Sequence, residues 1–521
     1  MLNEKRFLLT ATGLFVVFIL LTSPLFYMII TSRGEFIQEA SAQEEEITVD
    51  EVGEPTGEAT PEQPPPTTTP PEEPPNIFLI ISDDQPFYTE KYTPAILNKI
   101  FANGTSFSDA FISTSMCCPS RASILTGLYA HNHGTITNSI RHQLTNTTFF
   151  QAIDTANLDY RTAMVGKYMN SQSGDCRKEF DYWVAFPGAG PWYNGTNKPL
   201  NVNCKWTIFN NTYSTYLLRD YALQFLNATI TEGKPFVMWF SPFNPHLPTT
   251  PAQEDANLYP NGLPSYYLPP SFNESDVSDK PAWVQTLPLS CQDRPVSECE
   301  KAYKDEQLRI VRNLASFDRS VNALLNFLDS KGELSNTLII YINDNGIFHG
   351  EHRMLHDKKN GHYKESVKAI MGARWDGHIP VGQTYELVGN IDIAPTVYDA
   401  LGLTPPYPLD GQSLLDLWRV GSEPWRQSFL LEHWDYLTHI DATIVTKEWS
   451  YTETKGNKSE LYDRGKDPYE LNNLWCSLDD PSCAYSWTIT KLAAELRLLR
   501  PSWDSDAQCP CLRYRHNGQP I

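Results

Sequence analysis

Four short apolar segments, each followed at once by polar residues, limit the folds that are open to this chain. Runs with the length and composition of buried strands occupy residues 76–82, 162–165, 236–240 and 337–342. Helical patterns separate these runs, which is typical of an α/β sheet. Between them, Thr93, Pro94 and Gly104 frame one helix, and an amphipathic pattern predicts a long one at about 305–330.

The residues that follow the four predicted strands carry the chain's candidate chemistry. They are Asp83-Asp84, Gly166-Lys167, Pro245-His246 and Asp344-Asn345-Gly346. Ligands of open α/β sheets bind outside the carboxyl ends of the strands, so we expect these side chains to meet at one rim. A single Asp after a strand is more often a turn residue. Four such segments together predict a functional site.

Three carboxylates and one amide at this rim suggest a metal site. They are Asp83, Asp84, Asp344 and Asn345. Neighbouring carboxylates repel each other unless a cation neutralises them, and an all-oxygen ligand set suits Ca²⁺ or Mg²⁺ better than Zn²⁺. A rival zinc site would use His349, His352, His356 and His362. No thiolate pattern accompanies these histidines, so the sequence favours the oxygen site.

The first 75 residues differ from the rest of the chain. Residues 7–30 contain no charged side chain, and at 1.5 Å per residue they span roughly 36 Å, enough to cross a bilayer. We expect residues 1–33 to be an uncleaved membrane anchor with the body outside the cytoplasm. The alternative is a secretory signal cleaved at Ala40-Ser41-Ala42, which would leave the body secreted or lysosomal. Residues 34–75, with nine prolines and twelve acidic but no basic side chains, predict an extended linker.

The composition agrees with export. The chain has 41 basic and 62 acidic residues, a net charge of −21, which argues against a nucleic-acid partner. Ten cysteines suit an oxidising compartment, and proximity suggests the pairs Cys176/Cys204, Cys291/Cys299 and Cys476/Cys483, although spacing alone does not fix connectivity. Sequons for N-glycosylation occur at Asn103, Asn146, Asn194, Asn210, Asn227, Asn273 and Asn457.

The most specific motif is the segment 117–127, Cys-Cys-Pro-Ser-Arg-Ala-Ser-Ile-Leu-Thr-Gly. On its own, a cysteine pair before proline is compatible with a disulfide or a structural thiol. The segment nevertheless resembles the sulfatase signature, Cys-x-Pro-Ser-Arg followed by Leu-Thr-Gly, and all seven defining positions match. The resemblance extends across the body, through the residues after the four strands and through 391–396, 409–411 and 461–463.

The resemblance implies an alkaline-phosphatase-like α/β fold, a mixed sheet between helices. It implies a catalytic domain at 76–420 and a smaller α+β C-terminal subdomain at 421–521. It further implies that a maturation enzyme oxidises Cys117 to formylglycine (3-oxoalanine). One Ca²⁺ ion would bind to Asp83, Asp84, Asp344, Asn345 and the modified Cys117. Arg121 would steady the formylglycine, and the sulfate would be bound by Lys167, His246 and Lys359.

The chain departs from many sulfatases at one place. Gly166-Lys167 is followed by Tyr168-Met169-Asn170, where those enzymes carry a histidine that helps the leaving group. This stretch, the Cys117 segment and His131-Asn132-His133 resemble instead the N-acetylglucosamine-6-sulfatases and heparan 6-O-endosulfatases. The resemblance therefore implies a 6-O-sulfated amino sugar of a glycosaminoglycan as substrate, with Asn170 in contact with it. His131 and His133 either line the cleft or are ordinary polar loop residues.

Three other functions fit parts of the sequence: an arylsulfatase of other specificity, a phosphoesterase with the same fold, and an inactive glycoprotein that binds sulfated polymers. A phosphoesterase would want Ser or Thr as nucleophile and usually two zinc ions, so Cys117 argues against it. An inactive binder has no need of the complete set of metal-ligand side chains. We therefore expect a hydrolase of sulfuric esters.

Overall fold

The computed structural model describes residues 73–139, 144–170, 176–188, 192–354, 359–419, 421–435 and 439–500. The expected anchor at residues 7–30 and the acidic linker up to residue 72 lie outside these ranges, as do His356, Cys509 and Cys511. Within the described ranges, no helix combines the length and the apolar composition that a bilayer crossing requires.

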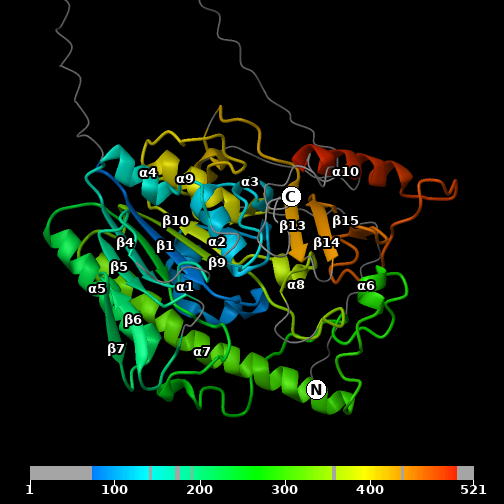
Figure 1. Cartoon of the computed structure of the whole chain (residues 1–521), viewed down its shortest axis with the longest axis horizontal. Helices are drawn as coiled ribbons and strands as arrows, with labels where there is room; N and C mark the ends of the chain where they lie inside the picture. The colour runs from blue at the N-terminus through cyan, green and yellow to red at the C-terminus, as the bar shows by residue number, and fades with distance from the viewer. Residues whose placement is uncertain are drawn as a thin grey trace, which may run out of the picture. The chain divides into compact units, whose positions relative to one another are not determined.

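The four strands expected from the sequence lie side by side in the middle of a ten-stranded sheet (Figure 1). They are β1 (Asn76–Ser82), β4 (Arg161–Gly166), β8 (Phe236–Ser241) and β9 (Thr337–Asn343). Their order is β9-β1-β8-β4, and all four are parallel. Because parallel strands end at the same edge, this order brings the four polar segments to one rim.

Shorter strands widen the sheet on both sides and make it mixed. Beyond β9 lie β10 (Met371–Arg374), β2 (Thr105–Phe107) and β11 (Gly382–Thr384), and beyond β4 lie β5 (Tyr182–Ala185), β6 (Lys198–Val202) and β7 (Lys205–Phe209). β10 is antiparallel to β9, and β6 is antiparallel to β5 and β7. A separate two-stranded sheet pairs β3 (Ala110–Phe111) with β12 (Val388–Gly389).

Helices cover both faces of the large sheet, because its central strands are apolar on both sides. In β1, Leu79 and Ile81 face one core while Phe78 and Ile80 face the other, and none is more than 1% exposed. The first core is covered by α2 (Cys117–Thr126), α4 (Phe149–Ala156) and α9 (Ile393–Ala400). The second is covered by α1 (Pro94–Lys99), α5 (Ser214–Thr231) and α7 (Val296–Ser330). The expected mixed α/β sheet between helices is confirmed (Figure 1).

Helix α7 begins at Val296, whereas the sequence predicted a start near residue 305. The later part of the helix carries the apolar stripe that predicted it. The first turns are mostly polar and are held by the Cys291–Cys299 disulfide and by Tyr303, which stacks on Phe272. Hydropathy does not register these contacts, which is why the expected start was wrong.

The C-terminal part forms a second, antiparallel sheet. Its strands are β13 (Phe429–Asp435), β14 (His439–Val445), β15 (Trp449–Thr454) and β16 (Glu460–Asp463), and α10 (Ser486–Leu499) packs on them. Leu431, Ile444 and Leu461 share a core with Phe111 and Val367 of the preceding chain, so the small sheet rests on the large domain. Short helices occur at α3 (Ala130–His133), α6 (Ala282–Gln285) and α8 (Lys364–Val367).

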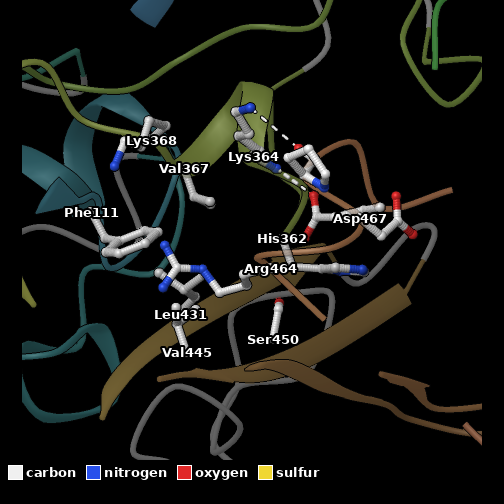
Figure 2. A pocket seen from close by; sticks show the side chains of 12 residues that line it. Phe111, His362, Lys364, Val367, Lys368, Leu431, Val445, Ser450, Arg464 and Asp467 are labelled. Atoms are coloured by element: carbon white, nitrogen blue, oxygen red, sulfur yellow. Dashed lines mark hydrogen bonds between the residues drawn. The ribbon is translucent and has the colours of Figure 1, made fainter. Parts of the chain in front are cut away.

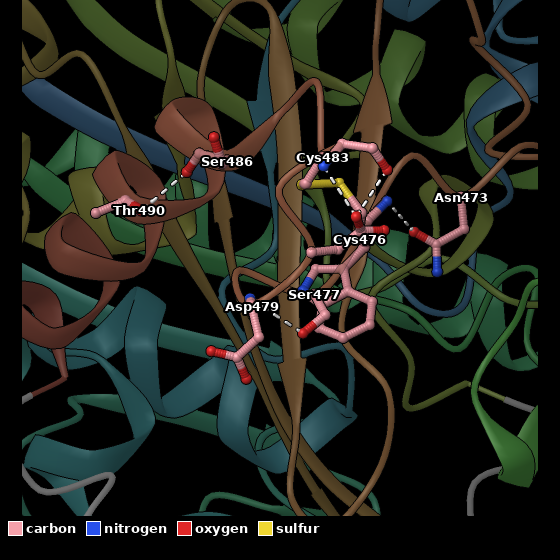
Figure 3. The surroundings of a disulfide bond; sticks show 10 residues. Asn473, Cys476, Ser477, Asp479, Cys483, Ser486 and Thr490 are labelled. Carbon is pink, nitrogen blue, oxygen red and sulfur yellow. Dashed lines mark hydrogen bonds between the residues drawn. A yellow bond between two sulfur atoms is a disulfide. The ribbon is translucent and has the colours of Figure 1, made fainter.

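Three disulfides join the cysteines that proximity paired in the sequence. They are Cys176–Cys204, Cys291–Cys299 and Cys476–Cys483. The last closes a loop between β16 and α10, where the Asp479 N–H donates to the Ser477 hydroxyl inside the loop (Figure 3). Among the described cysteines, Cys117 and Cys118 are the two outside disulfides, and both are buried.

One histidine ties the small sheet to the large domain. His362 is buried, and its Nε2 lies 2.9 Å from the Glu460 Oε2 on β16 while its Nδ1 lies 3.4 Å from the Asp441 Oδ1 on β14. Burial opposes protonation of the ring, but the two carboxylates outweigh this effect and raise the pKa of His362 to about 10. His362 is therefore charged at neutral pH.

We expect this contact to make stability depend on pH. The pKa of His362 rises from 6.5 in the unfolded chain to about 10 in the folded one, so its contribution is complete below pH 6.5 and is lost as pH rises through 10. In urea denaturation, the unfolding free energy of the parent should fall by up to a few kcal/mol between pH 6.5 and 10. In His362→Gln this fall should be absent. The matched control is the exposed His378→Gln, which should keep the parent slope. Equal slopes for the parent and His362→Gln would contradict the assignment.

Candidate active site

The polar ends of the four central strands meet at one rim of the sheet, as the sequence predicted. Asp83 continues β1 and bridges to Pro245 beyond the end of β8. The Asp344 N–H donates to the last carbonyl of β1 at 2.9 Å, and the Lys167 N–H donates to the last carbonyl of β8 at 2.7 Å. These backbone contacts fix the side chains of the rim at the points where the strands end.

The last residue of β4 has to be glycine. Gly166 has a φ of +122°, and a Cβ atom there would lie 2.0 Å from the carbonyl oxygen of Ser241. The close approach of β4 and β8 brings the next residue, Lys167, into the rim, where it is 2% exposed. Its Nζ lies 2.5 Å from the Asp83 Oδ2.

Cys117 is the first residue of α2 and lies at the centre of the rim. Its side chain is fully buried, with Sγ 3.8 Å from the Asp83 Oδ1, 4.0 Å from the Asp84 Oδ1 and 3.1 Å from the Lys359 Nζ. Burial raises the pKa of this thiol to about 12, even though Lys167 and Lys359 lower it. An unmodified Cys117 therefore stays protonated at neutral pH and is a poor nucleophile.

The two adjacent carboxylates are balanced by cations from other segments. Burial opposes ionisation of Asp83, but Lys167, His246 and Arg121 outweigh it and hold its pKa below the usual range. Burial acts in the same way on Asp84, and the Lys359 Nζ, 2.5 Å from its Oδ1, is the first cation that lowers its pKa. Asp84 also has a φ of +57°, a strained conformation for a residue other than glycine and one that recurs at functional sites.

Arg121 braces the site from α2. Its side chain is fully buried, with Nε 2.9 Å from the Asp344 Oδ2. One Nη donates to the Lys167 carbonyl at 2.6 Å and to the Ser241 hydroxyl at 2.9 Å, and the other lies 3.7 Å from the Asp83 Oδ2. Arg121 thus joins the ends of all four central strands to the helix that carries Cys117.

Four potential metal ligands converge here, with their ligand atoms within 4.8 Å of one another. They belong to Asp83, Asp84, Cys117 and His246, a set that includes His246 but not the expected Asp344. The two Asp344 oxygens accept from Arg121 and from the Asp84 N–H instead. Asn345 donates its Nδ2 to the Asp84 Oδ1 at 2.6 Å, and its buried Oδ1 has no hydrogen-bond partner among the described residues. An unsatisfied amide oxygen beside two ionised carboxylates fits a hard cation such as Ca²⁺.

His246 reaches the rim from the segment after β8. Its Nδ1 lies 2.9 Å from the Leu247 carbonyl, which can only accept, so Nδ1 carries a proton and Nε2 is left for other partners. Nε2 lies 3.3 Å from the Asp84 Oδ2, and the side chain is 27% exposed. This ring is more exposed to solvent than the Lys359 side chain, which is 15% exposed, and than the buried Asp83, Asp84, Arg121 and Lys167.

Two aromatic residues support the rim, and the sequence analysis did not identify them. The Phe243 ring stacks on His246 with ring centroids 4.4 Å apart, and the Lys167 Nζ lies 5.7 Å from the centre of the same ring. The Tyr193 hydroxyl donates to the carbonyls of Phe243 and His246. Phe243 follows β8 and could have been found from that position, whereas Tyr193 comes from a loop that carries no sequence signal.

Asn170 lies next to the second cysteine of the motif. Its N–H contacts the Cys118 Sγ at 3.1 Å, and its buried Oδ1 has no hydrogen-bond partner among the described residues. The segment 167–170 therefore runs from the rim to the start of α2.

The other histidines are bound elsewhere. His352 pairs with Glu274 at 2.9 Å, His362 with Glu460, and the His349 Nδ1 lies 3.3 Å from the Tyr88 hydroxyl, so these three do not form the rival zinc site. His133 is 2% exposed and its Nε2 lies 3.1 Å from the Ser123 hydroxyl, which makes it a core residue. His131 pairs with the buried Glu432 at 3.0 Å.

Comparison with known proteins identifies the family. Residues 75–403 match the family model described as Sulfatase, and residues 350–500 match the one described as N-sulphoglucosamine sulphohydrolase, C-terminal. The human N-acetylglucosamine-6-sulfatase is 30% identical over 381 residues, which cover 68% of this chain and 67% of the human protein. A putative extracellular sulfatase Sulf-1 homologue of Caenorhabditis elegans is 29% identical over 68% of this chain, but the chain spans only 52% of that relative's length.

The fold is also similar to a solved structure. A protein in complex with its substrate, D-glucosamine-2-N,6-O-disulfate, superposes with a TM-score of 0.70 and 22% identity, over 84% of this chain and 100% of that one. At this identity the similarity concerns the fold alone, and it supports the expected alkaline-phosphatase-like architecture with its C-terminal subdomain. The family model covers the whole rim, from Asp83 to Lys359, and so this chain belongs to the sulfatase family, the hydrolases of sulfuric esters.

Proposed function

We propose that this protein hydrolyses sulfuric esters with a formylglycine made from Cys117 and one Ca²⁺ ion. The observation that carries the proposal is the setting of Cys117, a fully buried thiol at the start of α2 between two carboxylates and a lysine. With a pKa of about 12, this thiol is a poor nucleophile as it stands. Two carboxylates and a lysine around an unreactive thiol are better explained if the thiol is the precursor of the reacting group.

Formylglycine and Ca²⁺ would supply the chemistry that the unmodified side chains lack. A hydrated formylglycine would provide an oxygen nucleophile for the sulfur atom, and Ca²⁺ would neutralise the charge of the sulfate oxygens. We assign Asp83, Asp84, Asp344 and Asn345 to the ion. Asp83 and Asp84 are held ionised, and Asn345 has a spare amide oxygen, as a hard cation requires.

The chain's cations bind the anionic substrate. Lys167 and Lys359 pair with Asp83 and Asp84, and both ammonium groups lie beside the Cys117 side chain, where the ester sulfate has to sit. With the carboxylates committed to a cation, these lysines are available to the oxygens of a sulfate group. Arg121 fixes the start of α2 relative to the strand ends, which keeps residue 117 in line with them.

His246 is our candidate for the acid that protonates the leaving alcohol. Its Nε2 faces the rim, its Nδ1 is held by the Leu247 carbonyl, and it keeps contact with solvent. A proton on Nε2 can be given to a departing oxygen and recovered from water. Asn170, whose Oδ1 is buried and unsatisfied, is our candidate for a contact to the substrate.

The substrate we infer is a 6-O-sulfate on an N-acetylglucosamine-type sugar of a glycosaminoglycan. Support comes from the names of the relatives and from the sulfated glucosamine bound in the similar solved structure. The inference is consistent with Met169 and Asn170, which stand where many sulfatases carry a histidine. In this respect the chain resembles the N-acetylglucosamine-6-sulfatases. An arylsulfatase of other specificity is the alternative.

We further propose that the catalytic body works outside the cytoplasm. Three disulfides suit an oxidising compartment, and the sequon residues Asn103, Asn194, Asn210 and Asn227 are exposed. The membrane anchor at residues 7–30 remains a prediction from the sequence.

The modification can be read from a mass spectrum. In the tryptic peptide 100–121, enzymatically deglycosylated because it contains Asn103, the Cys117 side chain should appear as an aldehyde and Cys118 as a thiol. A Cys118→Ser variant is the matched control and should still carry the aldehyde. Full activity in a preparation with an intact Cys117 thiol would contradict the proposal.

The metal can be measured directly. Asp83→Asn and Asp344→Asn should each lose Ca²⁺, determined by elemental analysis, and lower the turnover of a sulfate ester by more than about a hundredfold, because one ionised ligand is missing. The surface variant Asp376→Asn should keep both. Stoichiometric zinc without calcium in active protein would overturn the assignment.

The substrate and the role of His246 can be tested together. A primary sugar alkoxide is a poor leaving group and needs an acid, so His246→Ala should slow glucosamine-6-sulfate turnover by about a hundredfold or more, and aryl sulfate turnover by clearly less. His378→Ala is the control. Efficient aryl sulfate cleavage by the parent, with no sulfate released from glucosamine-6-sulfate oligosaccharides, would move the assignment to an arylsulfatase.

A further inference from the structure

A second cavity lies between the large domain and the small sheet. Its volume is about 260 Å³, and it shares no lining residue with the rim around Cys117. The walls come from β3, α8 and the strands β13 to β15, and from the segment after β16 (Figure 2). A cavity of this size is close to the lower limit for small-molecule sites, so it suits a single ring rather than an extended chain.

Most of the wall is apolar. Phe111, Val367, Leu431 and Val445 line it, and each is at most 5% exposed to solvent. These side chains also belong to the core that joins the two sheets, so the cavity is held open by packed elements and not by a mobile loop. A ligand would therefore place a face rich in C–H groups against an aromatic ring and three aliphatic side chains.

One side of the cavity carries excess positive charge. Lys368 and Arg464 share a single carboxylate, with the Lys368 Nζ 3.3 Å from the Asp109 Oδ1 and an Arg464 Nη 2.6 Å from the same atom. Both cations lie over the Phe111 ring, at 5.1 and 5.2 Å from its centre. Two cations and one carboxylate leave a net charge of +1, and the three side chains are only 18–21% exposed.

Apart from the paired His362, the other charged residues of the lining are Lys364, Asp467 and Glu470, whose formal charges sum to −1, so the positive excess is local to the side with Lys368 and Arg464. The carboxylate oxygens of Asp467 accept the N–H groups of Leu471 and Asn472, and Glu470 accepts that of Lys364. Figure 2 shows Phe111, Lys368 and Arg464 on one side of the pocket and Asp467 on the opposite side. Burial and the neighbouring Arg464 lower the pKa of Lys368 to about 8 in spite of Asp109, which agrees with an under-neutralised cation.

We propose that this cavity binds one acidic sugar unit, with its carboxylate or sulfate group on Arg464 and Lys368 and its ring against Phe111. An anion would balance the positive charge that Asp109 does not neutralise. Both Nη groups of Arg464 already donate to Asp109, so the anion would be received by Lys368 and by the N–H groups of Arg464 that Asp109 does not use. The sugar ring would pack on the apolar wall formed by Val367, Leu431 and Val445 beside Phe111. The proposal concerns a second site and does not depend on which ester the rim around Cys117 hydrolyses.

Calorimetric titration of the whole protein with D-glucuronate tests the site. Saturable binding is expected, while methyl glucoside, which has the ring without the charge, should not bind. Arg464→Gln should weaken binding about tenfold, because it removes a hydrogen bond to a charged group. Asp109→Asn should strengthen binding, because it removes the competing carboxylate. Lys466→Gln is the matched control: it removes an exposed cation of the same segment outside the cavity and should leave binding unchanged.

The outcomes separate the possible sources of the anion. Inorganic sulfate that binds as tightly as glucuronate would overturn the sugar part of the proposal. A uronate-containing tetrasaccharide that binds at least as well as the monosaccharide supports a unit within a chain, and a weaker one supports the free sugar. Crystals soaked with glucuronate should show it beside Arg464.

Binding lost in His246→Ala but kept in Arg464→Gln would place the ligand at the catalytic rim and overturn the proposal. Lys368→Met replaces Arg464→Gln if thermal unfolding shows that the latter is misfolded.

Discussion

The arrangement of the rim depends on two adjacent buried carboxylates at the end of β1, whose charge the other side chains have to balance. Asp83 and Asp84 are at most 5% exposed, and two such groups in direct succession cannot both ionise without compensation. The compensation comes from four segments far apart in the sequence, through Lys167, His246, Lys359 and Arg121. A parallel sheet whose strands end at one edge brings these segments together, so the charge balance and the topology depend on each other.

The lysines of the rim have two possible sets of partners, the carboxylates and an incoming anion. In the structure the lysines pair with the carboxylates directly. The proposed cation, once bound to the carboxylates, would release the lysines toward an incoming anion. Gly166 fixes the strand end before Lys167, and Tyr193 and Phe243 hold His246 in place.

The sequence predicted those parts of the fold and of the site that depend on the local order of apolar and polar residues. Apolar runs predicted the four central strands, and the polar residues after them predicted the rim, because both depend only on local order along the chain. The short outer strands, the first turns of α7 and the burial of His133 could not be predicted in this way. They depend on contacts between distant segments, such as Tyr303 with Phe272 and His133 with Ser123. The partners of Asp344 could not be predicted either: its two oxygens accept from Arg121 and from the Asp84 N–H, and its role as a metal ligand stays a prediction.

The burial of Cys117 also constrains the order of events in the life of the chain. In the folded protein its side chain has no exposed surface, and it is enclosed by α2, two strand ends and Lys359. If Cys117 is converted as proposed, the converting enzyme would need the segment around it while it is still extended, before α2 packs against the sheet. Folding and conversion would then compete for the same nascent chain. The ratio of the two rates would set the fraction of active molecules, and a chain that folds first would be correctly folded but inactive.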